Sequence, residues 1–531
     1  MELKQIKEFL KEKEKQISVL YKNLNISYWN ASISGKKEDY DKYAENELVL
    51  KKFFNNKEDF EKIKEMKEET IDDEITARQL KLLYYAYLSY QGDYKLMEEI
   101  TKKVAATEQK FNTFRAKIND KEYTENEIKD IIKKDKDNKK VKEAWEAIKI
   151  QGKIVEKEVL EIVRLRNKLA KSLGFRDYYE FSLEVGEQKE EEIEKIMDEL
   201  DRLTEKPFKN LKKEMDLVIS KKYNIKKEEL GPWNYGDPFF QEGPDIYEIS
   251  LDNYYKENIV EKAKKYYKSI GLEVKGILSR SDLYEKPGKN QHAYCIDIDR
   301  YGDVRTLQNL KNTERWMETL LHELGHGIYS ENHNPSLPFI LRDAAHTFTT
   351  EAIAMLFGRK ARNAEFVGNY CKIEEKDKEK IKETVKKILR LRMLVLSRWV
   401  QVMFRFEQEL YKNPEQDLKK LWWQLVKKYQ LIDFSRDEPD WASKYHIVSA
   451  PVYYHNYLLG ELLASQLHNH ITKNITKNPD SDYSGKKEVG KYLIENIFQP
   501  GARYRWDEMI KRALGEPLNP IYFVEQFAKD D

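Results

Sequence analysis

Apolar and polar residues along most of this chain recur with the period of an α-helix. Up to about residue 230 one helical pattern follows another, with charged outer faces and few Gly or Pro residues. Patterns of the same kind return in the C-terminal part. The clearest predicted helices cover residues 80–90, 96–119, 143–173, 379–411, 417–429 and 452–471. The pattern therefore predicts a mainly α fold.

Two segments interrupt the helical pattern. Residues 231–244 contain a cluster of Gly, Pro and aromatic residues, which indicates a loop. We expect the chain to cross there from a helical half, residues 1–230, into a second half, residues 231–531. Residues 293–298 and 304–307 alternate between apolar and polar positions on either side of a turn. This period of two predicts a short β-hairpin.

The motif H-E-L-G-H at residues 322–326 carries the strongest chemical signal of the chain. It lies in a predicted helix, where residues four apart share one face, so that His322 and His326 can reach the same metal ion. Glu323 would then lean over the open side of the metal. This is the arrangement of zinc hydrolases. The alternative is an exposed helix face with two incidental histidines.

A catalytic zinc site needs a third protein ligand and one open position. Glu351 is the candidate, because it lies in the apolar helical stretch 348–357, where an unpaired carboxylate would be costly to bury. A salt bridge to an arginine would explain it equally on its own. Together with His322 and His326 it would complete a set of two histidines and one glutamate that binds one Zn²⁺ ion per chain, and residues 231–531 would then be the catalytic half.

The segment 444–457 is unusually rich in lysine, histidine and tyrosine. Peptide hydrolysis develops a negative oxygen, which fixed hydrogen-bond donors of these kinds stabilise. The alternative is that the tyrosines line a helix interface, as aromatic residues often do. His292, on the predicted hairpin, could bind a substrate backbone, although a single histidine is more often structural.

Charge and cysteine content narrow the class of protein. The chain has 531 residues, of which 95 are Lys or Arg and 94 are Asp or Glu, so its net charge is +1. This balance argues against nucleic acid as a partner. No stretch approaches eighteen consecutive apolar residues, and the charged N-terminus resembles no signal peptide. From the charge balance and the lack of such a stretch we expect no membrane partner. The presence of only two cysteines fits the reducing cytoplasm, where we expect the protein to lie.

Several segments, in this order along the chain, match the motifs of a known family. They are Leu165-Arg166-Asn167 before Gly174-Phe175, Gln291-His292-Ala293, the H-E-L-G-H motif, Arg342-Asp343 before Glu351-Ala352-Ile353, Trp422-Trp423-Gln424-Leu425, and Lys444-Tyr445-His446-Ile447 before Tyr454-His455-Asn456-Tyr457. They resemble the angiotensin-converting-enzyme family of zinc dipeptidyl carboxypeptidases, which is related to the thimet oligopeptidase family. The resemblance runs from about residue 165 to residue 523 and is faint in the N-terminal helices.

The resemblance implies a fold and a set of site residues. The fold would be a large, two-halved helical ellipsoid with a deep central cleft and an N-terminal helical lid that excludes folded proteins. The implied roles are zinc binding by His322, His326 and Glu351, general base and acid catalysis by Glu323, oxyanion stabilisation by Tyr457 and His446, binding of the substrate strand by His292 and Ala293, and binding of the substrate's C-terminal carboxylate by Lys444 and Tyr454.

The chain departs from this family at positions that matter. In the family a glutamine near the position of Trp233 helps to bind the substrate's C-terminal carboxylate. Asn234-Tyr235-Gly236 stand there instead, so we expect weaker binding of that carboxylate. Two arginines that bind activating chloride are replaced by Val426 and Asn456, which predicts little dependence on chloride. The acid four residues after the glutamate ligand is Met355, and we expect Asp343 to orient a zinc-binding histidine in its place.

We interpret the chain as a monomeric zinc metallopeptidase that acts on short unstructured peptides and releases C-terminal dipeptides. An oligoendopeptidase is the alternative within the enzyme class, because residues 453–458 also resemble the Y-Y-S-Y-L-W pattern of the oligopeptidases. An inactive helical scaffold is the alternative of another class. Against that scaffold, the zinc-binding and proton-transfer positions are all filled, including Glu323.

Overall fold

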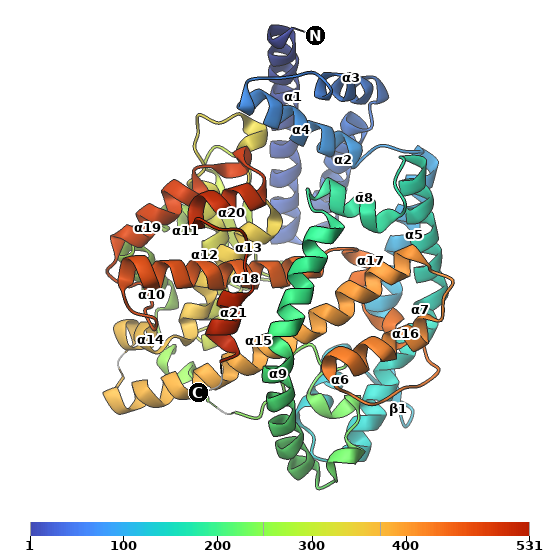
Figure 1. The fold of residues 1–531 in the computed structure, drawn as a ribbon, viewed down its shortest axis with the longest axis vertical. Coiled ribbons are helices and arrows are strands. Elements are labelled where there is room, and N and C mark those ends of the chain that lie inside the picture. Colours follow the sequence, from blue (N-terminus) through green and yellow to red (C-terminus); the bar gives the residue numbers. More distant parts are fainter. Residues whose placement is uncertain (1, 248, 372, 530–531) are drawn as a thin grey trace. The chain divides into compact units, whose positions relative to one another are not determined.

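The computed structural model describes residues 2–247, 249–371 and 373–529. The chain is 70% helical, and within these ranges its only sheets are two small antiparallel hairpins (Figure 1). The predicted mainly α fold is confirmed. The helices are α1 (Leu3–Ser34), α2 (Lys37–Phe54), α3 (Lys57–Lys67), α4 (Glu74–Leu88), α5 (Tyr94–Thr113), α6 (Glu125–Lys134), α7 (Asn138–Ser172), α8 (Tyr178–Val185), α9 (Glu190–Tyr223), α10 (Ile259–Ser269), α11 (Lys275–Arg280), α12 (Glu314–Glu331), α13 (Thr347–Gly358), α14 (Ala364–Tyr370), α15 (Glu375–Lys412), α16 (Leu418–Leu425), α17 (His446–Ser449), α18 (His455–Ile471), α19 (Lys487–Leu493), α20 (Trp506–Leu514) and α21 (Ile521–Phe527).

Side-chain caps explain where several of these helices begin. The carboxylates of Asp73, Asp93 and Asp137 accept hydrogen bonds from backbone N–H groups in the first turns of α4, α5 and α7. Thr313 does the same for α12, where its side chain accepts from the N–H of Trp316. Each cap satisfies a donor that the helix cannot pair internally. The helix that carries the H-E-L-G-H motif therefore starts at a position fixed by its own sequence.

The predicted hairpin before α12 is confirmed. Strand β3 (Tyr294–Asp297) pairs with β4 (Val304–Leu307) in antiparallel register, with Cys295 opposite Thr306. Both strands contact α12, so the hairpin lies directly on the helix that carries the motif. The two cysteines of the chain, Cys295 and Cys371, are free thiols.

One predicted helix was wrong in its C-terminal part. The pattern predicted a helix over residues 96–119, but α5 ends at Thr113 and a second hairpin follows, formed by β1 (Ala116–Ile118) and β2 (Lys121–Tyr123). Asn119 and Asp120 form its turn with φ values of 49° and 62°. Positive φ at both central residues is the mark of a two-residue hairpin turn, and Asn and Asp adopt it most readily.

The other predicted helices are present with shifted ends. Residues 80–90 and 143–173 correspond to α4 and α7, and residues 379–411 to α15. The prediction over 417–429 is α16 followed by a π-helical turn, Val426–Gln430. The prediction over 452–471 starts late, because α18 begins at His455.

The chain forms two compact units. Unit 1 comprises Met1–Gln91, Ile249–Val385 and Leu459–Asn519, and unit 2 comprises Gly92–Glu248, Lys386–Leu458 and Pro520–Asp531. By these contacts the chain passes between the units several times, whereas the sequence led us to expect one crossing near residues 231–244. The division into a lid-bearing half and a catalytic half around a cleft stays a prediction.

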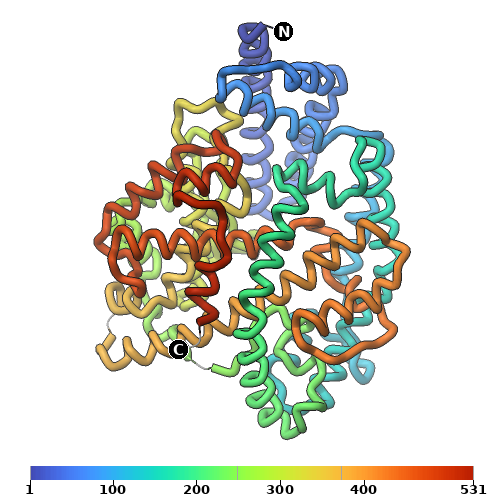
Figure 2. Tube along the Cα trace, viewed as in Figure 1, coloured from blue at the N-terminus to red at the C-terminus, as the bar shows by residue number. Residues whose placement is uncertain are grey.

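Unit 1 joins three distant parts of the sequence. Its N-terminal helices share an apolar cluster that includes Ile17, Phe54 and Tyr87, and Phe339 from the middle of the chain packs into the same cluster. Helices α12 and α13 lie against each other. Gly460 of α18 lies against Glu351 and Met355 of α13, so that a helix near the C-terminal end, drawn orange-red in Figure 2, supports the middle segment, drawn yellow.

Unit 2 contains the long helices α7 and α9 and the C-terminal part of α15. Its core is rich in aromatic side chains, with the ring of Trp145 at 6.3 Å from Trp423 and 6.0 Å from Phe434. Gly152 of α7 lets the chain at Pro439 approach closely, since an added Cβ would come within 2.3 Å of the Pro439 carbonyl oxygen. These contacts pack α7 against the later segment of the unit that contains Trp423, Phe434 and Pro439.

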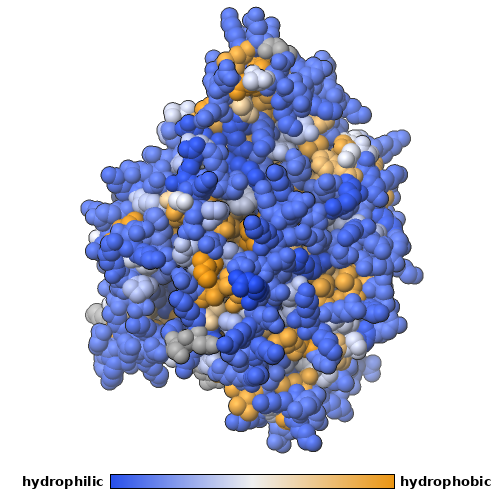
Figure 3. Space-filling view, in the orientation of Figure 1, coloured by the Kyte–Doolittle hydropathy of each residue, from blue (hydrophilic) through white to orange (hydrophobic). Residues whose placement is uncertain are grey.

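One face of the surface is mostly polar. The face drawn in Figure 3 is hydrophilic over most of its area, with apolar side chains in scattered groups. No helix within the described residues combines the length and the apolar character needed to cross a membrane.

Candidate metal centre

A glycine sets the distance between the two helices of the centre. Gly325 of α12 faces α13, where an added Cβ would lie 2.8 Å from the Cα of Ala354 and 3.2 Å from its backbone nitrogen. No side chain larger than hydrogen fits at this separation without a shift of backbone. The close approach brings Glu351 of α13 to the face of α12 that carries both histidines of the motif.

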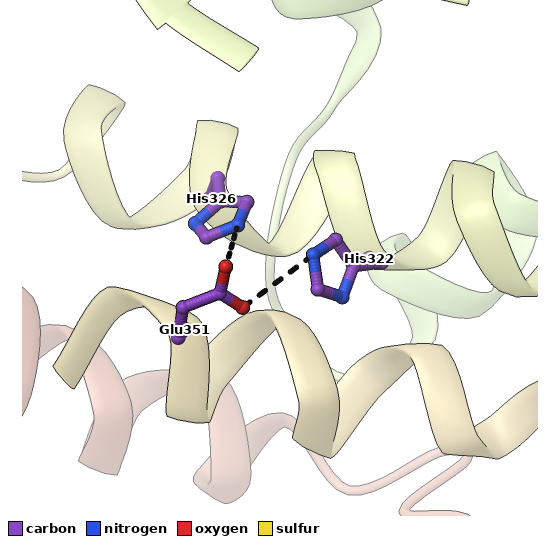
Figure 4. A group of neighbouring side chains, drawn as sticks. All are labelled: His322, His326 and Glu351. Atoms are coloured by element: carbon purple, nitrogen blue, oxygen red, sulfur yellow. Dashed lines mark ion pairs between the residues drawn. The ribbon is translucent and has the colours of Figure 1, made fainter. Parts of the chain in front are cut away.

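The two histidines and Glu351 converge on a common point (Figure 4). The Nε2 atom of His322 lies 3.6 Å from one carboxylate oxygen of Glu351, and the Nε2 atom of His326 lies 3.8 Å from the other. Two ligand atoms about 2.1 Å from a tetrahedral zinc ion lie roughly 3.4 Å apart. Among the described residues this is the only group of His, Cys, Asp and Glu that could hold a metal ion.

Electrostatics make this group suitable for a divalent cation. Burial lowers the pKa of His322 to about 4 and that of His326, which also lies beside His322, to about 3, so both rings are neutral at pH 7 and can donate a lone pair. Burial raises the pKa of Glu351 to about 7, and its Oε2 atom is buried without a hydrogen-bond partner. A cation between these atoms would satisfy the carboxylate, so the residues present fit zinc.

Glu323 lies beside this group, as the motif predicts. Its side chain is buried on α12, and burial together with the nearby Glu351 raises its pKa to about 8. The side chains of His322, His326 and Glu351 keep exposed fractions of 28%, 19% and 20%. Because these three side chains remain partly exposed, a water molecule or a substrate group can reach the point on which they converge.

A threonine, and not the predicted aspartate, supports one of the histidines. The Nδ1 atom of His326 forms a hydrogen bond of 2.8 Å with the hydroxyl of Thr350, next to Glu351 on α13. The expectation that Asp343 takes this role was wrong, because Asp343 forms an ion pair with Arg300 and its side chain is 56% exposed. The second nitrogen of a ligating histidine usually has such a partner, which fixes its tautomer and orientation.

His292 and Ala293 lie at the start of β3, also in unit 1. The backbone N–H of His292 donates to the side chain of Asn290 at 2.9 Å, and its imidazole is exposed. Ala293 leads directly into the strand at Tyr294. The structure thus places both residues beside the strand that contacts α12, while their contact with a substrate stays a prediction.

The remaining predicted site residues form a second group, in unit 2. The ring of Tyr454 lies 5.0 Å from that of His446 and 5.4 Å from that of Tyr457. The ammonium of Lys444 lies 5.1 Å from the Tyr454 ring. The Nδ1 atom of His446 is buried without a hydrogen-bond partner, and burial together with Lys444 lowers the pKa of this ring to about 4. Lys444, His446, Tyr454 and Tyr457 are therefore neighbours, as the sequence led us to expect.

Gln241 joins this second group and was missed in the sequence. The ammonium of Lys444 donates to its side-chain oxygen at 2.5 Å, and the hydroxyl of Tyr454 donates to the same atom at 3.4 Å. We had expected the glutamine near Trp233, where Asn234 stands; Asn234 instead bonds Asn138. The only signal in the sequence was a glutamine a few residues further along the same loop.

The two positions where the family has chloride-binding arginines carry no charge in this chain. Asn456 is buried and accepts a hydrogen bond of 2.8 Å from the side-chain amide of Gln188. Val426 is buried in the π-helical turn after α16. Neither side chain can donate a charged hydrogen bond to an anion.

Comparison with known proteins gives two family matches. The model of peptidase family M3 matches residues 131–529, which include both groups of predicted site residues. The model described as angiotensin-converting enzyme matches residues 1–230, where we had found the resemblance faint. None of the curated proteins matches the chain.

Proposed function

Since this chain belongs to peptidase family M3 and is therefore a metallopeptidase, we propose that it uses zinc to release dipeptides from the C-termini of short, unstructured peptides. The observation that supports peptidyl-dipeptidase activity is the grouping of Lys444, Gln241 and Tyr454 in unit 2. A buried ammonium beside an amide and a phenol offers charge and hydrogen bonds to one carboxylate. An enzyme that holds the free end of a peptide in this way cuts at a fixed distance from it.

The residues that would hold the zinc ion are His322, His326 and Glu351. When bound, zinc acts as a Lewis acid that lets water lose a proton near neutral pH and polarises a carbonyl oxygen. Glu323 would accept the proton from the attacking water and deliver it to the leaving amine, which needs a carboxyl group beside the reacting atoms. Burial and the nearby Glu351 raise the pKa of Glu323 above the usual range of a carboxyl group toward neutral pH, where one group can both accept and release a proton.

Other side chains would act on the substrate. Tyr457 and His446 would donate hydrogen bonds to the oxygen that becomes negative in the tetrahedral intermediate. His292 and the backbone of Ala293 would hold the substrate as an extra strand beside β3. These roles follow from the family resemblance and stay predictions.

The test compares matched peptides with a free and an amidated C-terminus, with products identified by mass spectrometry. We expect dipeptide release from the free peptide and a loss of cleavage on amidation, because amidation removes the charge that Lys444 binds. Equal cleavage of both peptides would contradict peptidyl-dipeptidase activity. The variant Glu323→Gln serves as the control, since it should keep zinc and lose nearly all turnover.

A second candidate is an oligoendopeptidase that cuts inside short peptides. The observation in its favour is that the part of the chain with the H-E-L-G-H motif matches the family M3 model, while the match to the angiotensin-converting-enzyme model ends at residue 230. Internal cleavage of the amidated peptide would establish it. The cytoplasmic location, which the two free thiols favour, and the monomeric state stay predictions.

A further inference from the structure

A buried lysine of α7 has no partner for its charge. Lys149 is 4% exposed, and its ammonium lies 3.3 Å from the centre of the Phe239 ring and 5.5 Å from that of Trp145. Among the described residues, no oxygen accepts a hydrogen bond from it and no carboxylate lies within ion-pair distance. Burying an ammonium in this way is costly, so buried charges are normally paired. The ammonium of Lys149 could therefore bind an anionic group of a ligand.

The same aromatic ring carries a second buried ammonium. Lys444 lies 5.1 Å from the Phe239 ring and at the same distance from the rings of Trp399 and Tyr454. It donates to Gln241 but has no ion-pair partner among the described residues. Two buried ammonium groups of unit 2 thus lie against the same aromatic ring, and neither has an ion-pair partner among the described residues.

The nearby acids of the chain are already engaged. Asp440 forms an ion pair with Arg436. Asp237 accepts hydrogen bonds from the backbone N–H groups of Phe239 and Glu242. Burial lowers the pKa of Lys149 to about 7 and that of Lys444 to about 8. The anionic groups of a ligand would favour the charged form of both amines. The attraction between these charges would contribute to the free energy of ligand binding.

We propose that Lys149 determines specificity by binding the side-chain carboxylate of a C-terminal Glu or Asp residue, while Lys444, with Gln241 and Tyr454, binds the α-carboxylate of the same residue. The inference rests on the proposed function and narrows its substrate class to peptides with an acidic C-terminal residue. A C-terminal Glu or Asp residue carries two carboxylates, and two ammonium groups, those of Lys149 and Lys444, lie near the Phe239 ring to bind them. A neutral C-terminal residue would leave Lys149 buried and unpaired.

The kinetic test uses two peptides that differ only in a C-terminal Glu or Gln. For the wild-type enzyme we expect a KM about tenfold lower for the Glu peptide, since one charge-assisted pair contributes on the order of a factor of ten in affinity. Lys149→Met should remove this preference by raising KM for the Glu peptide and leaving the Gln peptide unchanged. Lys149→Arg, which keeps the charge, should retain part of the preference.

A binding measurement keeps the inference testable if the enzyme proves to be an endopeptidase. Isothermal titration of the wild-type enzyme with Ala-Glu and Ala-Gln should show tighter binding of Ala-Glu, and Lys149→Met should abolish the difference. Methionine fills the space of the lysine stem without its charge, and thermal melting checks that the variant folds. Equal affinity of the two dipeptides for the wild type, or an equal loss for both in Lys149→Met, would overturn the inference. Cleavage of amidated peptides would instead overturn the proposed function.

Discussion

Gly325 of α12 lies so close to Ala354 of α13 that a Cβ atom on the glycine would come within 2.8 Å of the alanine Cα. This contact joins a residue inside the H-E-L-G-H motif to the helix that carries Glu351. The separation of the two helices, and with it the distance from Glu351 to both histidines, depends on the absence of a side chain at residue 325.

The substitution Gly325→Ala should weaken both the fold and zinc binding. The new methyl group meets backbone, which cannot turn aside as a side chain can, and overpacking of this kind costs about 1–3 kcal/mol. The helices should separate and carry Glu351 away from His322 and His326. Chemical denaturation and a zinc-binding titration measure the two effects.

Gly327→Ala is the matched control on the same helix. Its added Cβ would lie 3.0 Å from the flexible end of Ile277 and 3.7 Å from the sulfur of Cys295. Alanine is a better helix former than glycine by about 1 kcal/mol, and the contact is with the end of a side chain rather than with backbone, so this variant should lose less stability than Gly325→Ala. If both variants bind zinc equally well, the close approach at Gly325 does not set the site.

Loss of the Thr350 hydroxyl should weaken zinc binding without changing a ligand. Thr350→Val keeps the shape of the side chain but removes its hydrogen bond to His326 Nδ1. Loss of such partners typically lowers metal affinity 10–100-fold. Competition with a chromogenic chelator gives the dissociation constant. Thr350→Ser, which keeps the hydroxyl, should bind zinc almost as the wild type does, and an unchanged constant for the valine variant would refute the role.

Tyr457→Phe should lower kcat far more than it changes KM. A donor to the developing oxyanion acts in the transition state, and removal of one such donor typically costs about 10²–10³ in kcat. Steady-state kinetics on one peptide separates the two parameters. Tyr453, whose ring lies 5.3 Å from that of Tyr457, provides the control variant Tyr453→Phe. An unaltered kcat for Tyr457→Phe would remove this tyrosine from the catalytic group.

Activity should depend little on chloride. The side chains at Asn456 and Val426 are neutral and buried, and Asn456 is already bonded to Gln188. We expect less than about a twofold change when sodium chloride replaces sodium sulfate at equal ionic strength, because the two salts then screen surface charges equally. A large stimulation would mean that other cationic groups bind the ion.

The sequence predicted what depends on local spacing. Residues four apart on a helix must share a face, so the positions of His322, His326 and Glu323 followed from the motif alone. The pairing of β3 with β4 followed from their alternation and the turn between them. These features need no knowledge of the tertiary structure.

Features that depend on packing between distant segments were missed. Gln241 reaches Lys444 because a loop folds back onto residues far along the chain, and its distance in sequence from Trp233 gave no sign of this. Thr350 rather than Asp343 meets His326, because the close packing of α12 and α13 places the threonine there. The hairpin at Asn119 was missed for a different reason, since the helical pattern of α5 masked a short turn signal.

The zinc content of the purified protein tests the central claim most directly. Measured by elemental mass spectrometry after removal of loosely bound metal, the wild type should carry one zinc ion per chain, and Glu351→Gln should carry far less, because it loses the carboxylate shared with His322 and His326. A wild type that retains no zinc after loading, or a Glu351→Gln variant that retains a full equivalent, would contradict the account.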